Sequence, residues 1–248
     1  MYALFVVGTA GSGKSALTSS LIGWLNERGN YAVGVNLDPG ALTLPYEPDV
    51  DVRNYIDIMS LMEEMGLGPN GALILASDLL ASRLKEVQEE LESLNPDYAI
   101  FDTPGQLELF SFRESGPYIA KRLVADEKAV VFLFDGPVVS SPRNFVSVAL
   151  LSASVQLRLG LPQVAVLSKS DLVEDVERIL ELASDPFMLE EELRKEGRFE
   201  LSVEMLRGME RVGMGFGLLP ISSKTLEGFV ELSATLTRIF RGGEEIGE

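Results

Sequence analysis

The chain has 248 residues, 46% of them hydrophobic and 24% charged, which is the balance of a globular protein with a substantial core. It contains no cysteine and no histidine, which excludes disulfides, thiolate nucleophiles, cysteine-ligated metals and imidazole general bases. The net charge of −17 argues against direct binding to nucleic acid or to a membrane, and no apolar run reaches the length of about eighteen residues that spans a bilayer, so a cytoplasmic protein is expected.

Short apolar runs alternate with longer helical stretches along the chain. The expected strands cover residues 2–7, 31–37, 98–102, 129–134, 163–167 and 218–221, and the expected helices cover residues 14–28, 72–94, 142–159 and 225–240. The strand runs are continuously apolar, as in strands that are covered on both faces. This order predicts an α/β fold: a doubly wound, mostly parallel sheet with helices on both faces and a binding site at the carboxyl ends of the strands.

One domain is expected over residues 1–248, with insertions at about residues 38–71 and 172–216. The first insertion is rich in proline, and the second is expected to be helical. The tail from residue 241 is expected to be disordered, because it is glycine-rich and terminal.

Each insertion carries apolar residues at helical spacing. In the first insertion we interpret them as an ordinary core stripe, with an adaptable partner surface as the alternative; they are Ile56, Met59, Met62 and Met65. In the second insertion, beside the acidic residues 190–192, we interpret them as a docking surface for protein clients; they are Met205, Met209, Val212 and Phe216.

The strongest motif directly follows the first expected strand and opens the first expected helix. It fits G-x-x-x-x-G-K-[ST] and reads Gly8, Thr9, Ala10, Gly11, Ser12, Gly13, Lys14 and Ser15, followed by Ala16. The glycines let backbone N–H groups turn toward an anion, and the helix adds the positive end of its dipole. Lys14 is expected to reach the β- and γ-phosphates, and Ser15 to ligate Mg²⁺. The motif therefore predicts a nucleotide site.

A second motif ends the strand at residues 98–102 and reads D-T-P-G-Q. Asp102 is placed to hold Mg²⁺ through water, which is the role of the acidic residue at this strand end in P-loop proteins. The backbone N–H of Gly105 is expected to meet the γ-phosphate, and Gln106 is expected to orient an attacking water.

A third motif, S-K-S-D, ends the strand at residues 163–167 and bears on the choice of base. The Asp171 carboxylate can accept two hydrogen bonds from guanine, whereas adenine would leave it unpaired. The stem of Lys169 is expected to cover one face of the base. The backbone N–H groups of Ser222 and Ser223, after the sixth strand, are expected to meet the guanine carbonyl oxygen. Together these residues predict GTP and GDP as the ligands.

The order of these motifs, together with the tripeptide Gly68-Pro69-Asn70, resembles the GPN-loop GTPase family. The resemblance covers nearly the whole chain and includes N-L-D-P-G at residues 36–40, P-Y at 45–46 and D-V-R at 51–53. It implies a homodimer, of the dimeric class of P-loop GTPases, whose nucleotide sites face each other. Asn70 would reach the γ-phosphate region of the partner's site, and Asp38, Gln106 and Glu108 would act around Mg²⁺ and the attacking water. It also implies a role in the assembly of multisubunit complexes such as RNA polymerase.

Two positions and two other function classes stay open. Ser168 stands where N-K-x-D motifs have asparagine, so a weaker tie between the base loop and the P-loop is expected, because a hydroxyl has fewer donors than an amide. Arg53 either neutralises phosphates or forms a salt bridge with Asp49 or Asp51.

The alternatives to a GTPase are a nucleotide-dependent binding scaffold with incidental hydrolysis, and a P-loop kinase or ATPase. A kinase would need an arginine-rich lid, and the sequence has no such cluster.

Overall fold

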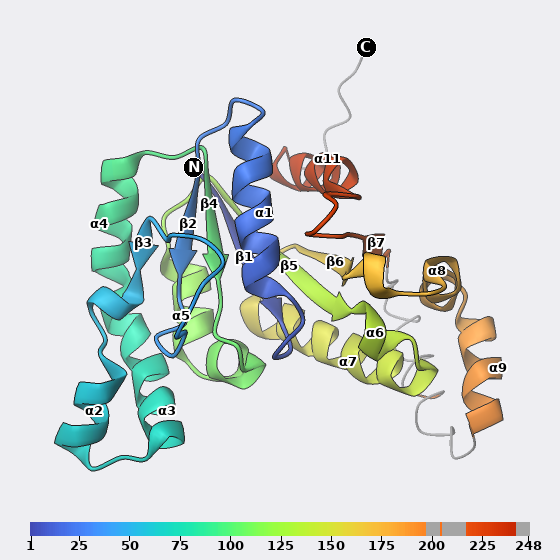
Figure 1. Ribbon diagram of the computed structural model, residues 1–248, viewed down its shortest axis with the longest axis horizontal. Coiled ribbons are helices and arrows are strands. Elements are labelled where there is room, and N and C mark those ends of the chain that lie inside the picture. Colours follow the sequence, from blue (N-terminus) through green and yellow to red (C-terminus); the bar gives the residue numbers. More distant parts are fainter. Residues whose placement is uncertain (197–203, 205–216, 242–248) are drawn as a thin grey trace.

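In the computed structural model, which describes residues 1–196, 204 and 217–241, seven parallel strands form one sheet with helices on both sides (Figure 1). The order across the sheet is β3-β2-β4-β1-β5-β6-β7. The strands are β1 Tyr2–Gly8, β2 Ala32–Asn36, β3 Val50–Asp51, β4 Tyr98–Asp102, β5 Glu127–Asp135, β6 Gln163–Ser168 and β7 Leu219–Pro220. The predicted doubly wound fold is confirmed.

Helices connect successive strands, except that β2 and β3, which also pair in parallel, are joined by the loop at residues 37–49. The helices are α1 Lys14–Asn26, α2 Ile58–Met65, α3 Pro69–Leu80, α4 Leu84–Leu94, α5 Ser115–Arg122, α6 Gly136–Val139, α7 Pro142–Leu159, α8 Val176–Ser184, α9 Pro186–Glu196 and α11 Phe229–Phe240. Short 3₁₀ turns cover Val52–Asn54, Ala81–Arg83 and Ser170–Leu172, and a π-helical turn covers Glu108–Phe112.

The core has two layers because successive side chains of a strand point to opposite faces of the sheet. In β1, Leu4 and Val6 pack with residues of α1 and α11, whereas Phe5 and Val7 pack with residues of α4, α5 and α7. The central residues of β1 and β5 are fully buried on both faces. This double burial explains the continuous apolar runs of the strands, and it leaves only their carboxyl ends free to build a site.

The expected single helix over residues 72–94 is wrong. The 3₁₀ turn Ala81–Arg83 separates α3 from α4, and the hydroxyl of Ser82 donates to the carbonyl of Leu79 at 2.6 Å within this turn. The apolar α3 contacts α5 and the π-helical turn, whereas the charged α4 packs beside β3. Neither glycine nor proline marks the break, so packing against different partners decides it.

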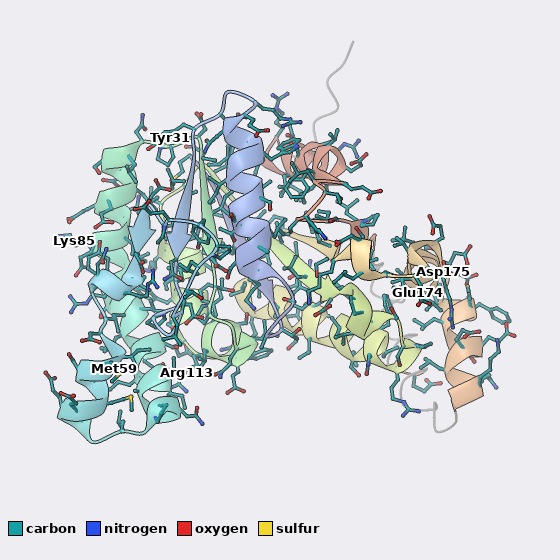
Figure 2. All side chains as sticks on the ribbon, viewed as in Figure 1. Tyr31, Met59, Lys85, Arg113, Glu174 and Asp175 are labelled. Carbon is teal, nitrogen blue, oxygen red and sulfur yellow. The ribbon has the colours of Figure 1, made fainter. Side chains whose placement is uncertain are left out.

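The segment at residues 38–71 contains β3, the turn Val52–Asn54, α2 and the start of α3. The interpretation of its methionines as a core stripe is wrong: Met59 is 63% exposed and Met65 is 61% exposed, and only Ile56 of the series is buried. Helix α2 lies beside α3 at one corner of the molecule (Figure 1), and Met59 on this helix is labelled in Figure 2. The alternative, a partner surface, therefore stays a hypothesis.

The segment that begins at residue 172 is helical as far as it is described, through α8 and α9. The candidate client surface of Met205, Met209, Val212 and Phe216 lies outside the described residues, and so does the tail from residue 242. Among the described residues, no helix combines the length and the apolar character that crossing a bilayer requires.

Candidate nucleotide-binding site

Strand register brings the three sequence motifs to one edge of the sheet. Val6 of β1 lies beside Asp102 of β4, Gly8 lies beside Leu133 of β5, and Asp135 of β5 lies beside Ser168 of β6. All of these strands are parallel, so their carboxyl ends meet at the same edge. The P-loop therefore lies in the middle, with the D-T-P-G-Q motif on one side and the S-K-S-D motif on the other.

The P-loop wraps tightly between β1 and α1. Gly11 and Gly13 have φ of +77° and +95°, the left-handed region that glycine adopts without steric cost. The ammonium of Lys14 donates to the carbonyls of Gly8 and Thr9, each at 3.0 Å, and of Gly105 at 3.2 Å. Burial lowers the pKa of Lys14, while the charges of Asp102 and Asp38 oppose that shift. The three N–H donors of the ammonium thus bind backbone carbonyls, and the oxygens of a bound phosphate can replace these carbonyls as acceptors.

The buried carboxylate of Asp102 has one oxygen free. Its Oδ2 accepts a hydrogen bond from the hydroxyl of Tyr46 at 3.3 Å, and its Oδ1 has no hydrogen-bond partner among the described residues. Burial raises the pKa of Asp102 to about 6, although the nearby hydroxyl of Ser15 and the charge of Lys14 lower it. Such an orphaned anionic oxygen is costly unless a cation or donor meets it.

A cavity of about 330 Å³ joins this carboxylate to the P-loop, lined among others by Lys14, Ser15, Asp38 and Gly105. Carboxylate and hydroxyl oxygens are the donors that Mg²⁺ prefers. The free oxygen of Asp102 and the hydroxyl of Ser15 therefore fit a Mg²⁺ site next to the phosphate-binding loop.

The carboxylate of Asp38 accepts hydrogen bonds from its own loop and from the segment after β4. Its Oδ1 accepts from the N–H of Gly40 at 2.9 Å, and its Oδ2 accepts from the N–H of Gly105 at 3.0 Å. The backbone N–H of Asp38 donates to the buried Asn36, whose amide donates to Asp51 at 2.9 Å. The N–H of Gly105, expected to meet a phosphate, is thus engaged by a carboxylate in this structure.

Arg53 completes this network instead of facing the phosphate-binding loop. Its Nε and Nη2 donate to the carboxylate of Asp51, and its Nη1 donates to the carbonyl of Ala41 at 2.8 Å. The salt-bridge alternative for Arg53 is therefore confirmed, with Asp51 as the partner and not Asp49. Its role is to brace the loop that carries Asp38.

The remaining candidate catalytic residues line a second cavity, of about 780 Å³, beside the start of the P-loop. Asn70 enters it from the first turn of α3, and Gln106 and Glu108 enter it from the segment after β4. Thr9 and Ala10 form its P-loop side, and its apolar rim consists of Ile74, Leu107, Phe112 and Leu151. All three polar side chains are exposed, and the structure brings them together within one chain.

The S-K-S-D loop is tied to the P-loop. The hydroxyl of Ser168 lies 2.8 Å from the carbonyl of Ser12 and 3.2 Å from that of Phe134, so its single proton links the two loops where asparagine would use an amide. The ammonium of Lys169 pairs with Asp135 at 2.7 Å, and its stem lies over Gly13. Asp171 is exposed and has no ion pair or hydrogen bond to any described residue, so its carboxylate is free to accept a ligand.

The loop after β7 closes this end of the site. Its contacts show that the N–H of Ser222 donates to the carbonyl of Glu227 at 3.2 Å, so this donor is already engaged within the loop. The hydroxyl of Ser20 in α1 donates to the carbonyl of Ser223 at 2.8 Å and ties the loop to the P-loop helix. Of the two backbone N–H groups expected to meet the guanine carbonyl oxygen, the geometry therefore favours that of Ser223.

Four residues with roles in this site escaped the sequence reading as functional groups: Tyr46, Asn36, Asp51 and Asp135. Asp135 carried a usable signal, because it ends an apolar strand and precedes glycine, as Asp102 also ends a buried strand. Asn36 and Tyr46 belong to stretches named only for the family resemblance, and Asp51 was considered only as an ion-pair partner of Arg53. The contacts that tie them into the site join Asn36 to Asp51, 15 residues away, and Tyr46 to Asp102, 56 residues away, so no local pattern shows these contacts.

The fold and the site together define a P-loop nucleotide-binding protein. A family model described as "Conserved hypothetical ATP binding protein" matches residues 6–242. The chain is 35% identical over 233 residues to "GPN-loop GTPase PAB0955" of Pyrococcus abyssi, covering 91% of this chain and 92% of that one. It is also 36% identical over 200 residues to GPN-loop GTPase 3 of Kluyveromyces lactis, covering 78% and 74% of the two chains.

The solved structures agree with these relatives. The crystal structure of PAB0955, described as a GTPase in apo form from Pyrococcus abyssi, superposes with a TM-score of 0.85 at 32% identity, over 96% of this chain and 97% of that one. The chain therefore belongs to the GPN-loop GTPase family. Membership supports GTP binding and a GTP-hydrolysing P-loop enzyme at the level of the family.

Proposed function

We propose that this protein binds Mg²⁺ and GTP and hydrolyses GTP to GDP and phosphate, acting as a dimeric molecular switch. The observation that carries the proposal is the convergence of Lys14, Ser15, Asp102, Asp38 and Gly105 on one cavity. These residues supply a phosphate-binding ammonium, backbone donors and the oxygen ligands of a divalent cation, in one place and without histidine.

Ser15 and Asp102 would hold the Mg²⁺, with Asp38 beside them. When bound, the ion would neutralise negative charge on the β- and γ-phosphates. The carboxamide of Gln106 and the carboxylate of Glu108 hydrogen-bond to water and orient it toward the γ-phosphorus. The new bond from the water oxygen to phosphorus replaces the bond to the β–γ bridging oxygen, which leaves on GDP.

Asp171 is the residue on which we base the choice of guanine. Its carboxylate is exposed, unpaired among the described residues, and follows a strand that is tied to the P-loop through Ser168. The family description names ATP, whereas the relatives are named GTPases. Phosphate release from GTP and from ATP with Mg²⁺ tests the choice: release from GTP alone supports it, and a similar rate with ATP contradicts it.

A matched variant makes this test sharper. Asp171→Asn should lower the affinity for GDP by at least a factor of about ten, because one of two hydrogen bonds to a charged acceptor is lost. Glu174→Gln, an exposed carboxylate three residues further along (Figure 2), is the control and should bind GDP as the wild type does. Binding of GDP without any phosphate release from GTP would favour the scaffold alternative.

The dimer is the second part of the proposal. Asn70 stands exposed on a cavity whose rim carries the exposed apolar side chains of Ile74, Phe112 and Leu151, a surface suited to association with a second copy. Across such an interface, the Asn70 amide would donate to the γ-phosphate region of the partner's site. A preorganised neutral donor of this kind supplies roughly 10²- to 10³-fold in rate.

Because Asn70 also lines the same cavity as Gln106 of its own chain, action within one chain and action across the dimer need to be separated. We propose mixing two variants, Asn70→Ala and Lys14→Ala, each with low activity alone. If Asn70 acts across the interface, each mixed dimer has one complete site, with Lys14 from one subunit and Asn70 from the other. Such a dimer regains up to about half of the activity of a wild-type dimer. If Asn70 acts within its own chain, the mixture stays as inactive as its components.

The cellular role is proposed from the family resemblance alone. We propose a cytoplasmic protein, one domain over residues 1–248, whose switch serves the assembly of multisubunit complexes such as RNA polymerase, with clients docking on the segment at residues 172–216. Capture of partners with and without this segment, in the GTP and GDP states, tests it. Equal capture in all four cases would contradict a nucleotide-controlled client surface.

A further inference from the structure

The loop that joins β2 to β3 is anchored on the sheet by one aromatic ring. The ring of Tyr46 lies against Gly34 of β2: a Cβ built on Gly34 would be 2.8 Å from Tyr46 Cε2. Glycine weakens a strand, and its use there marks a close approach by another group. The carbonyl of the neighbouring Pro45 accepts a hydrogen bond from Ser19 of α1 at 3.2 Å. The loop is therefore attached to both β2 and α1.

This anchoring places the Tyr46 hydroxyl on the metal-site carboxylate. The hydroxyl donates to Asp102 Oδ2 at 3.3 Å, while Oδ1 of the same carboxylate has no hydrogen-bond partner among the described residues. A carboxylate with one oxygen held in this way is restricted in its rotation, so its second oxygen keeps a defined direction. Tyr46 is 56 residues from Asp102 along the chain and lies in the loop between β2 and β3, whereas Asp102 ends β4.

We propose that Tyr46 is a positioning residue for the Mg²⁺ site, which holds one oxygen of Asp102 so that the other is presented to the ion. The inference rests on the proposed function, because it needs a Mg²⁺-dependent nucleotide site. Outer partners of metal ligands fix the orientation of those ligands, and their loss commonly lowers metal affinity by about 10- to 100-fold.

The same loop links the metal-site carboxylate to the segment after β4. Asp38 lies at the start of the loop and holds the N–H of Gly105, three residues after Asp102. Tyr46 lies eight residues further along and holds Asp102 itself. The loop therefore contacts both Asp102, which is expected to hold the ion, and Gly105, which is expected to meet the γ-phosphate.

Tyr46→Phe tests the proposal, because it keeps the ring against Gly34 and removes only the hydroxyl. A fluorescent GDP analogue is titrated into the full-length protein over a range of free Mg²⁺ and also in EDTA. We expect the half-saturating Mg²⁺ concentration to rise about tenfold, with the affinity in EDTA unchanged. In an Asp102→Asn background, Tyr46→Phe should have no further effect on Mg²⁺, because the ligand that it positions is absent.

Tyr31→Phe is the matched control. It deletes a hydroxyl from an exposed tyrosine that precedes β2, at the edge of the sheet opposite the P-loop (Figure 2), and should leave the Mg²⁺ dependence unchanged. The melting temperature of each variant without ligand checks that it is folded.

Three results would overturn the inference, and they are distinguishable. If wild type depends on Mg²⁺ and Tyr46→Phe matches Tyr31→Phe, the positioning role is wrong while the proposed function stands. If Tyr46→Phe weakens nucleotide binding equally with Mg²⁺ and with EDTA, the residue supports packing only. If Mg²⁺ changes nucleotide binding in neither the wild type nor Asp102→Asn, the metal part of the proposed function fails and the inference falls with it.

Discussion

The carboxylate of Asp38 accepts a hydrogen bond from the backbone N–H of Gly105 at 3.0 Å. The carbonyl of the same glycine accepts a hydrogen bond from the ammonium of Lys14 at 3.2 Å. Gly105 is thus held through both its N–H and its carbonyl by two groups that are expected to act at the nucleotide. A γ-phosphate that takes the Gly105 N–H must displace Asp38, and one that binds Lys14 competes with the carbonyl. These two contacts therefore predict that phosphate binding and movement of the segment after β4 are linked.

The first prediction concerns the Asp38 contact. Asp38→Ala removes the acceptor of the Gly105 N–H, and the nucleotide-free protein should lose about 1–2 kcal/mol in free energy of unfolding. Asp38→Asn keeps one oxygen, which can accept from Gly105 or from Gly40 but not from both, so this variant should lose less than Asp38→Ala. Urea denaturation without nucleotide measures both variants. Equal losses for Ala and Asn would contradict a stabilising role for an oxygen acceptor at this position.

The second prediction concerns the tie between the base loop and the P-loop. Ser168→Ala removes the hydroxyl that reaches the carbonyl of Ser12, so the affinity for GDP should fall about five- to tenfold, the scale of one hydrogen bond. Ser170→Ala is the control, because the Ser170 hydroxyl is buried and has no hydrogen-bond partner among the described residues. Titration calorimetry with GDP compares them. Equal affinities for the two variants would contradict a role for the Ser168 hydroxyl.

The third prediction concerns the link between α3 and the segment after the π-helical turn. Arg113 donates two hydrogen bonds of 2.6 Å to the carboxylate of Asp78, which lies on the helix that begins beside Asn70. The side chains are 37% and 41% exposed, so the pair stabilises the fold by only about 0.5–1 kcal/mol. Arg113→Gln should nevertheless slow phosphate release at saturating GTP, because α3, which carries Asn70, loses its link to the segment that follows Gln106.

A charge exchange provides the check on this third prediction. Asp78→Arg combined with Arg113→Asp should recover part of the rate that either single change loses. Arg122→Gln is the control, since Arg122 lies over the ring of Tyr118 on the exposed side of α5. A rate for Arg113→Gln equal to that of Arg122→Gln would show that the ion pair does not position the catalytic groups.

The fourth prediction concerns pH and the pair of Asp51 and Arg53. Burial raises the pKa of Asp51, but hydrogen bonds from Arg53 and Asn36 outweigh it and hold the pKa below the usual value of 3.8. A carboxyl group with a lowered pKa adds stability that is present above its unfolded-state pKa and is lost as the pH falls through its folded-state pKa. The stability difference between wild type and Asp51→Asn, measured by urea denaturation, should therefore shrink below about pH 4. A difference that stays constant with pH would contradict this.

Much of the molecule follows from local patterns in the sequence. The glycines of the P-loop, the aspartates at strand ends and the continuous apolar runs predicted the fold class and one edge of the sheet as the site. These signals are readable because the causes are local: only glycine adopts the φ of Gly11 and Gly13 without cost, and a strand buried on both faces must be apolar throughout.

The contacts between those elements were decided by the tertiary structure. The break between α3 and α4, the exposure of Met59 and Met65, the pairing of Arg53 with Asp51 and the hydrogen bond from Tyr46 to Asp102 each depend on how the packed chain surrounds them. Periodicity shows that a face is apolar but not what covers it, and a carboxylate at a strand end does not show which hydroxyl orients it. Such relationships arise only when the packed sheet brings separate loops to one edge.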